Sequence, residues 1–179
     1  MKKQLKFVIA AFLLTMTTFA VNAQTFKKSD KIVEGTVSYT KSTDVKASYS
    51  IKPAVGYFLT NKVAIGVFGE VGKTEAEETT NFGAFGRYYF LTIGKKCDIF
   101  SQVDVASNTT KVADVKANSV SGNLGLGANY FVTSKLGLTM NVANLISYES
   151  ADGKSTTTIG FEGVTNPFSV AKFGVIYKF

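Results

Sequence analysis

The sequence contains no histidine and no tryptophan, and it has a single cysteine and two prolines among its 179 residues. Without histidine the chain lacks the commonest general base and the commonest protein ligand of metals. One cysteine, Cys97, is too few for a disulfide within the chain. We therefore expect no catalytic residue, no metal site and no cofactor-binding site.

Apolar runs long enough to cross a membrane as a helix are missing as well. The apolar stretch 7–14 follows three lysines and precedes the small residues at 21–23. A basic start, a short apolar core and small residues before a cleavage point are typical of a secretory signal peptide. We expect residues 1–23 to be this signal and residues 24–179 to form one domain that is exported through the periplasm.

The formal net charge of +7 includes the three lysines of the expected signal peptide. The rest of the chain has no basic cluster with interleaved aromatic residues, which is the usual footprint of a nucleic-acid-binding surface. We therefore expect no nucleic-acid partner.

Much of the chain alternates between apolar and polar residues. Eight segments alternate apolar and polar residues with the period of two of a β-strand: 31–40, 46–60, 62–73, 79–90, 97–108, 119–132, 136–149 and 168–179. This pattern predicts an all-β protein, an eight-stranded antiparallel up-and-down transmembrane β-barrel. Pro53 and Asn144 interrupt it. We expect a bulge or a bend at Pro53, and a bulge or a different register at Asn144.

A short repeat marks the turns. Residues 57–63 (YFLTNKV) and 130–136 (YFVTSKL) match, and residues 89–92 share the first part of the motif. Each copy would end one strand, form a tight polar turn and begin the next strand, which predicts three short turns at one end of the barrel. At the other end we expect outer loops, at about 41–45, 74–78, 109–118 and 150–167.

Aromatic residues gather toward both ends of the expected strands, as they do at the two interfaces of a membrane barrel. The candidate interfacial aromatics are Tyr39, Tyr49, Tyr57, Phe82, Tyr88, Phe90, Tyr130, Tyr148, Tyr177 and Phe179.

Charged residues fall on the polar faces of the same strands. The candidates for an interior network are Glu34, Lys52, Glu70, Arg87, Asp98, Asp104, Lys172 and Lys178. Eight strands enclose a lumen only wide enough for side chains, and buried charges must pair. We therefore expect a salt-bridge and hydrogen-bond network instead of an open pore. An alternative register would turn Arg87 outward to the rim.

The last eight residues alternate in the same way and finish on an aromatic residue. The spacing of Lys172, Gly174, Tyr177 and Phe179 resembles the C-terminal signal that the bacterial outer-membrane assembly machinery reads.

With this motif and the repeated hairpins, residues 31–179 resemble the small eight-stranded outer-membrane barrels, the OmpA/OmpX-like β-barrel family. The resemblance implies a non-enzymatic, monomeric outer-membrane protein with a role in envelope integrity or surface interactions. The implied partners are outer-membrane lipid, lipopolysaccharide and, during biogenesis, the assembly machinery. A narrow porin-like channel and a secreted lipocalin-like ligand-binding barrel are the alternative hypotheses.

Overall fold

The structure is a computed structural model that describes residues 25–42, 45–75, 77–112, 115–151, 153–162 and 172–179. Within them one antiparallel sheet contains nine strands. The strands are β1 (Lys31–Ser42), β2 (Val45–Phe58), β3 (Val63–Lys73), β4 (Glu77–Ile93), β5 (Cys97–Val112), β6 (Val115–Phe131), β7 (Leu136–Ala151), β8 (Lys154–Glu162) and β9 (Lys172–Lys178). None of the described residues forms a helix with the length and apolar character that crossing a membrane requires.

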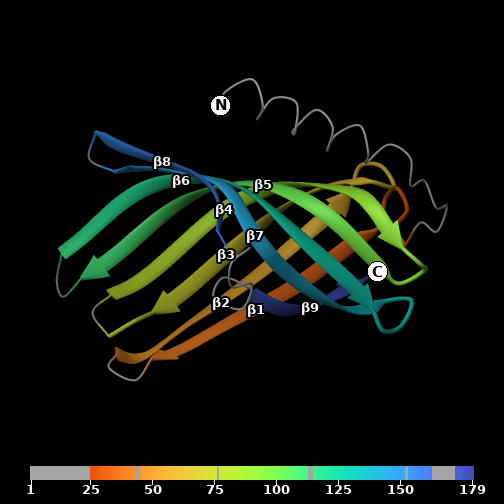
Figure 1. Cartoon of the computed structure of the whole chain (residues 1–179), viewed down its shortest axis with the longest axis horizontal. Helices are drawn as coiled ribbons and strands as arrows, with labels where there is room; N and C mark the ends of the chain where they lie inside the picture. The colour runs from red at the N-terminus through yellow and green to blue at the C-terminus, as the bar shows by residue number, and fades with distance from the viewer. Residues whose placement is uncertain (1–24, 43–44, 76, 113–114, 152, 163–171) are drawn as a thin grey trace.

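Eight of these strands close into a barrel (Figure 1). Strands β1 to β7 pair with their neighbours in chain order, and β9 completes the ring by pairing with β1 on one side and β7 on the other. Closure leaves each of the eight strands with a partner on both edges over this part of the barrel, so its backbone groups bond within the sheet.

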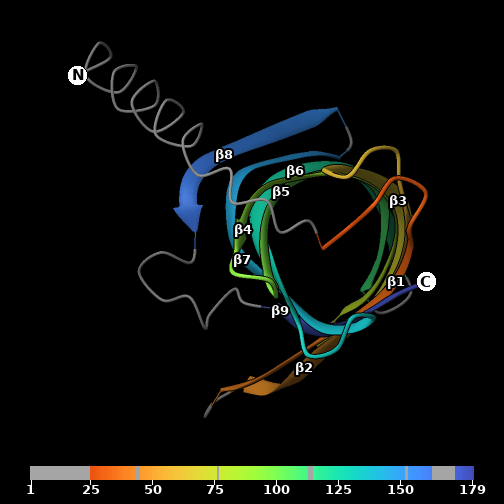
Figure 2. The same cartoon turned by 90° about the vertical axis from the view of Figure 1, so that its right-hand side faces the viewer.

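The ninth strand, β8, lies outside the ring (Figure 2). It pairs with the end of β7 that β9 does not reach, from Asn144 to Ala151. The prediction of a loop over the whole of 150–167 was therefore wrong. The sequence of β8, KSTTTIGFE, is polar on both faces at its start, and for that reason it gives no alternation signal.

The β5–β6 hairpin, opposite the short turns, is also longer than expected. β5 and β6 remain paired as far as Val112 and Val115, so the loop predicted at 109–118 is mostly strand. Side chains reinforce this extension, since Thr109 Oγ1 donates a hydrogen bond to Asn118 Oδ1 at 3.0 Å.

Pro53 and Asn144 have different consequences for the sheet. Pro53 is paired with Gly35 of β1, and the β2–β3 register is the same on either side of it. The prediction of a bulge at Pro53 was therefore wrong: the register is undisturbed, and only the pairing of residues 52 and 53 toward β3 is interrupted. Near Asn144 the register with β6 shifts twice, so bulges are the reason that the alternation fails there.

Glycines on the inner face make room for phenylalanine rings on neighbouring strands. Gly66 is the register partner of Phe85, and Gly83 is the partner of Phe68. A β-carbon at Gly66 would lie 2.5 Å from Phe85 Cζ, and one at Gly83 would lie 2.6 Å from Phe68 Cζ. Each ring therefore lies over a bare stretch of backbone, which lets bulky side chains fill a narrow barrel.

The repeated turns fold in the same way. Thr60 Oγ1 accepts hydrogen bonds from the backbone N–H groups of Lys62 and Val63, at 3.2 and 3.0 Å. Thr133 Oγ1 accepts the equivalent bonds from Lys135 and Leu136, at 3.2 and 2.9 Å. The threonine in the repeat is thus the residue that satisfies the turn's free donors.

Candidate functional site

The lumen is closed at the short-turn end by aromatic rings. Phe26, in the segment that precedes β1, is buried, with its ring centroid 4.2 Å from that of Phe58, 4.7 Å from that of Tyr89 and 5.3 Å from that of Phe131. Figure 2 shows this segment, in orange-red, crossing the mouth of the barrel. We call this group of four rings the aromatic plug.

Backbone bonds hold the segment in place. Ser29 N–H donates to Phe58 O at 2.9 Å, and Phe58 N–H donates to Asp30 O at 2.9 Å. Ser29 adopts a φ of 74°, an uncommon conformation for a residue other than glycine, which turns the chain across the mouth. This plug was not predicted, because alternation begins only at residue 31.

A buried ion pair lies next to the plug. Arg87 Nη2 and Nη1 bond Glu34 Oε1 and Oε2 at 2.8 and 2.9 Å, and Arg87 Nε bonds Gln102 Oε1 at 2.9 Å. The guanidinium also lies 4.1 Å from the ring centroid of Phe100. The pair joins β1 to β4 across the lumen with the two-pronged geometry that makes arginine–carboxylate pairs strong. Arg87 therefore points inward and not to the rim.

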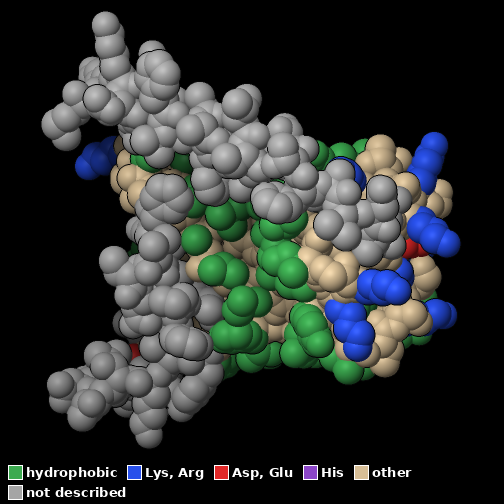
Figure 3. All heavy atoms as spheres, turned by 45° about the vertical axis from the view of Figure 1, so that its right-hand side comes forward, with side chains coloured by type: hydrophobic (Ala, Val, Ile, Leu, Met, Phe, Trp, Pro, Cys, Tyr) green, Lys and Arg blue, Asp and Glu red, His purple; other side chains and the backbone are tan. Residues whose placement is uncertain are grey.

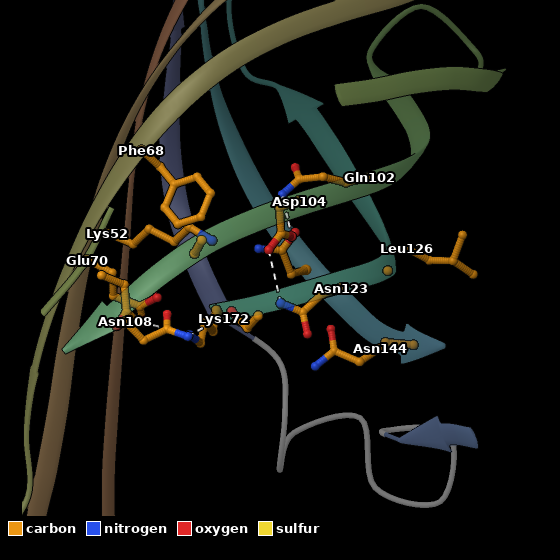
Figure 4. A pocket seen from close by; sticks show the side chains of 16 residues that line it. Lys52, Phe68, Glu70, Gln102, Asp104, Asn108, Asn123, Leu126, Asn144 and Lys172 are labelled. Atoms are coloured by element: carbon orange, nitrogen blue, oxygen red, sulfur yellow. Dashed lines mark hydrogen bonds and ion pairs between the residues drawn. The ribbon is translucent and has the colours of Figure 1, made fainter. Parts of the chain in front are cut away.

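Beyond the ion pair the lumen widens into a polar cavity of about 150 Å³ (Figure 4). On one wall Lys172 Nζ contacts Glu70 Oε1 at 2.8 Å. On another Asn123 Nδ2 donates to Asp104 Oδ1 at 3.0 Å. Lys52 Nζ lies 3.7 Å from the ring centroid of Phe68. The cavity is thus lined by charges of both signs that are largely held by neighbours.

The remaining two charged candidates lie at the plug end. Asp98 is buried and accepts a hydrogen bond from Thr92 Oγ1 at 2.7 Å. Lys178 Nζ lies 3.8 Å from Asp30 Oδ2 and donates to the carbonyl oxygen of Thr25. All eight charged candidates therefore have lumen-side positions, but they form separate groups along the barrel and not one network.

Most candidate interfacial aromatics lie on the outer face. The exposed ones are Tyr49, Tyr57, Phe82, Tyr88, Tyr130, Tyr148, Tyr177 and Phe179. Phe90 is half-buried at a shift in the β4–β5 register, and the side chain of Tyr39 lies outside the described residues. Tyr89, next to Tyr88, points inward, where its hydroxyl accepts hydrogen bonds from Arg87 and Asn129.

The C-terminal motif spans both faces of β9. Lys172 points into the cavity, whereas Tyr177 and Phe179 are exposed outside with their ring centroids 4.8 Å apart. Gly174 lies so close to Thr36 of β1 that a β-carbon there would clash with the Thr36 side chain and with the carbonyl oxygen of Gly35. The motif therefore sits at the seam where the last strand meets the first.

Groups of three or more potential metal ligands are absent from the part of the chain that the structure describes. Cys97 is half-buried and free at the start of β5. The inward phenylalanines, such as Phe68 and Phe100, are the main lumen residues that the sequence analysis missed. Their position on the polar face of a strand, beside a glycine of a neighbouring strand, is the signal that identifies them.

No protein-family model and no curated protein matches this chain. Solved structures do match. The N-terminal β-barrel domain of Pseudomonas aeruginosa OprF is similar with a TM-score of 0.58 and 16% identity, over 86% of this chain and 99% of that one.

Two further structures are similar. Neisserial surface protein A (NspA) matches with a TM-score of 0.53 and 16% identity, over 84% of this chain and 96% of that one. The outer membrane protein OprG from Pseudomonas aeruginosa matches with a TM-score of 0.50 and 14% identity, over 88% and 99%. At these identities the likeness establishes a shared fold.

Proposed function

Since the chain has the fold of the small eight-stranded outer-membrane barrels, we propose that it is a non-enzymatic, monomeric integral protein of the bacterial outer membrane. In this proposal residues 1–23 direct export through the periplasm, and the motif ending at Phe179 is read by the assembly machinery. Outer-membrane lipid and lipopolysaccharide surround the folded barrel, and nucleic acid is not a partner.

The observation that carries this proposal is the apolar outer face. Every strand of the ring exposes large hydrophobic side chains on the outside, among them Val37, Ile51, Ile65, Tyr88, Val105, Tyr130, Leu138 and Val175. A continuous apolar surface of this extent on a protein in water would promote aggregation. Facing lipid it is favourable, and the closed ring leaves few backbone groups exposed to hydrocarbon.

The filled lumen supports a structural role over a channel. The aromatic plug and the Arg87–Glu34 pair occupy successive levels of the barrel, and an eight-stranded barrel has little space beyond its own side chains. A lipocalin-like carrier needs an apolar interior for its ligand, whereas the cavity here is lined mainly by polar groups.

The extended hairpins favour a role at the cell surface. A membrane strand needs about 9–11 residues, but β5 and β6 have 16 and 17. Outer-membrane barrels keep their short turns on the periplasmic side, so the surplus length would project outward. We propose that this paired, polar projection is the part that meets external partners.

The first test is a folding-dependent gel shift on detergent-solubilised protein, run before and after boiling. We expect the unboiled barrel to migrate as a separate, compact band. Phe179→Ala should reduce the yield of this band during assembly in cells, whereas Phe179→Trp should retain it. Ile159→Ala, at an exposed residue of β8 outside the ring, serves as the control. A protein that is monodisperse without detergent and has no heat-modifiable band would contradict the proposal.

A further inference from the structure

The short-turn end of the barrel carries a ring of exposed lysines. They come from the segment before β1, from the first residue of β1 and from the three short turns: Lys27, Lys28, Lys31, Lys62, Lys95, Lys96 and Lys135. Figure 3 shows lysines gathered at this end of the molecule, next to hydrophobic side chains of the barrel wall. The nearby acidic side chains are already engaged: Asp30 with Lys178 and the Lys27 N–H, and Asp98 with Thr92. This end is therefore strongly positive.

An apolar groove on the outer face begins at this ring. It encloses about 830 Å³ and is almost free of polar surface, with Lys31, Tyr57 and Phe179 at its lysine-rich end. One wall is a row of register partners across four strands, formed by Val33, Val55, Val67 and Ala84. Three strand spacings amount to about 14 Å, so this apolar row extends around the barrel wall from β1 to β4.

Lys31 lines this groove, and backbone contacts place Lys28 and Lys62 in the segments next to it. Lys31 is the register partner of Tyr57. The backbone N–H of Lys28 donates to Asn61 Oδ1 at 2.7 Å, which ties it to the turn that contains Lys62. Tyr57 Oη donates to Ser29 Oγ at 3.1 Å, so the same tyrosine fixes the lysine-bearing segment against the barrel.

We propose that this corner is a binding site for an anionic glycerophospholipid. The phosphate is held by Lys28, Lys31 and Lys62, and one acyl chain lies in the groove between β1 and β4. This inference rests on the proposed membrane location. Lysines that lie just beyond an aromatic belt reach the depth of lipid phosphates, and each basic group near an anionic surface adds to the attraction.

Two features favour a lipid over a soluble polyanion. The lysines stand directly beside an apolar groove, which a soluble polyanion would leave exposed. They also lie at the short-turn end, which in the proposed orientation faces the inner leaflet and its glycerophospholipids, away from lipopolysaccharide.

The test is native mass spectrometry of the detergent-folded full-length mature barrel with equal amounts of phosphatidylglycerol and phosphatidylcholine. We expect one phosphatidylglycerol to be retained preferentially. The triple variant Lys28→Gln/Lys31→Gln/Lys62→Gln should weaken this binding about tenfold or more. The control Lys95→Gln/Lys96→Gln/Lys135→Gln removes the same charge elsewhere on the ring and should leave it nearly unchanged.

A second variant pair tests the groove. Ala84→Phe should fill it and lower retention of phosphatidylglycerol, whereas Ala128→Phe, on the outer side of β6, should not. Equal retention of both lipids would overturn the site, as would equal losses of phosphatidylglycerol binding in the two triple lysine variants. Full competition by soluble polyphosphate with no effect of Ala84→Phe would assign the lysines to a soluble polyanion instead. Each barrel must first display the heat-modifiable band, so a failure of the membrane proposal is recognised separately.

Discussion

Arg87 organises the buried polar layer of the lumen through its ion pair with Glu34. The arginine has ion-pair and hydrogen-bond partners on three sides, from Glu34, Gln102 and Tyr89. Its side chain is 1% exposed and that of Glu34 is 9% exposed. Charges that are this well buried require each other, because an unpaired one keeps its desolvation cost without any compensation.

Removing one partner of this ion pair should therefore destabilise the barrel much more than removing both. We expect Arg87→Met to lower the free energy of unfolding by about 3–5 kcal/mol, and Glu34→Gln/Arg87→Met to lower it less. The measurement is a urea titration of the barrel in lipid vesicles, followed by the fraction of compact band in unboiled samples. Lys73→Met is the matched control, since it breaks the exposed Lys73–Glu78 pair and should have little effect, because solvent screens an exposed pair. Equal losses from Arg87→Met and Lys73→Met would contradict this account.

For single residues, the sequence predicted the side of the strand on which a charged side chain lies, but not the residue with which it pairs. Parity along a strand gives the side on which a residue lies, and this placed Glu34 and Glu70 inward. Whether Glu34 meets Arg87 or Lys52 depends on strand tilt and on the stagger between strands, which period alone does not contain. The orientation of Arg87 stayed open for a related reason. Aligning Tyr89 with the outward Tyr57 would turn Tyr89 and Arg87 outward, but both point into the lumen.

Among the elements, the short turns are the most regular parts of the chain. In both copies of the repeat one threonine hydroxyl accepts two backbone N–H groups of the turn. The bond from Leu59 N–H to Val63 O has its counterpart in the bond from Val132 N–H to Leu136 O, both 2.9 Å. Similar geometry at two separate sites implies similar energetics.

We therefore expect Thr60→Val and Thr133→Val to destabilise the barrel by similar amounts, about 0.5–1.5 kcal/mol each. The double variant should lose about the sum, because the turns are separate. The same urea titration measures these losses. Ser134→Ala, in the middle of the second turn, is the control and should have little effect. A large loss from one threonine variant with none from the other would show that the repeat is not a common turn device.

Element prediction succeeded where one face of a strand is apolar and failed where neither face is. The eight ring strands have that contrast, and their ranges were close to the predicted ones. β8 lacks it along Lys154–Thr158, as does the end of the β5–β6 hairpin. The segment with Phe26 has one aromatic residue among polar ones, and a single residue has no period. Its burial depends on a mouth that exists only once the barrel has closed.

At the scale of the whole molecule, the lumen differs between its two ends. The plug end is packed with aromatic rings and an ion pair, whereas the other end holds the polar cavity. Ring closure followed from strands with one apolar face and no membrane-spanning helix, because a sheet in a membrane cannot leave an edge unpaired. The asymmetry of the lumen did not, because the inward Phe58 and Phe131 lie at polar-face positions, where charge was expected.

The plug predicts that the native barrel is closed to ions. In planar lipid bilayers we expect the wild-type protein to give no resolved conductance steps. In Phe26→Ala/Phe58→Ala/Phe131→Ala three of the four rings of the plug are gone, and brief, small openings should appear because water can then reach the ion pair from the short-turn end. Phe173→Ala, at an outward residue of β9, removes a ring without touching the lumen and should stay silent. Only barrels with the heat-modifiable band are compared. Regular steps in the wild type would favour the narrow-channel alternative, and a silent triple variant would mean that the ion-pair layer alone seals the barrel.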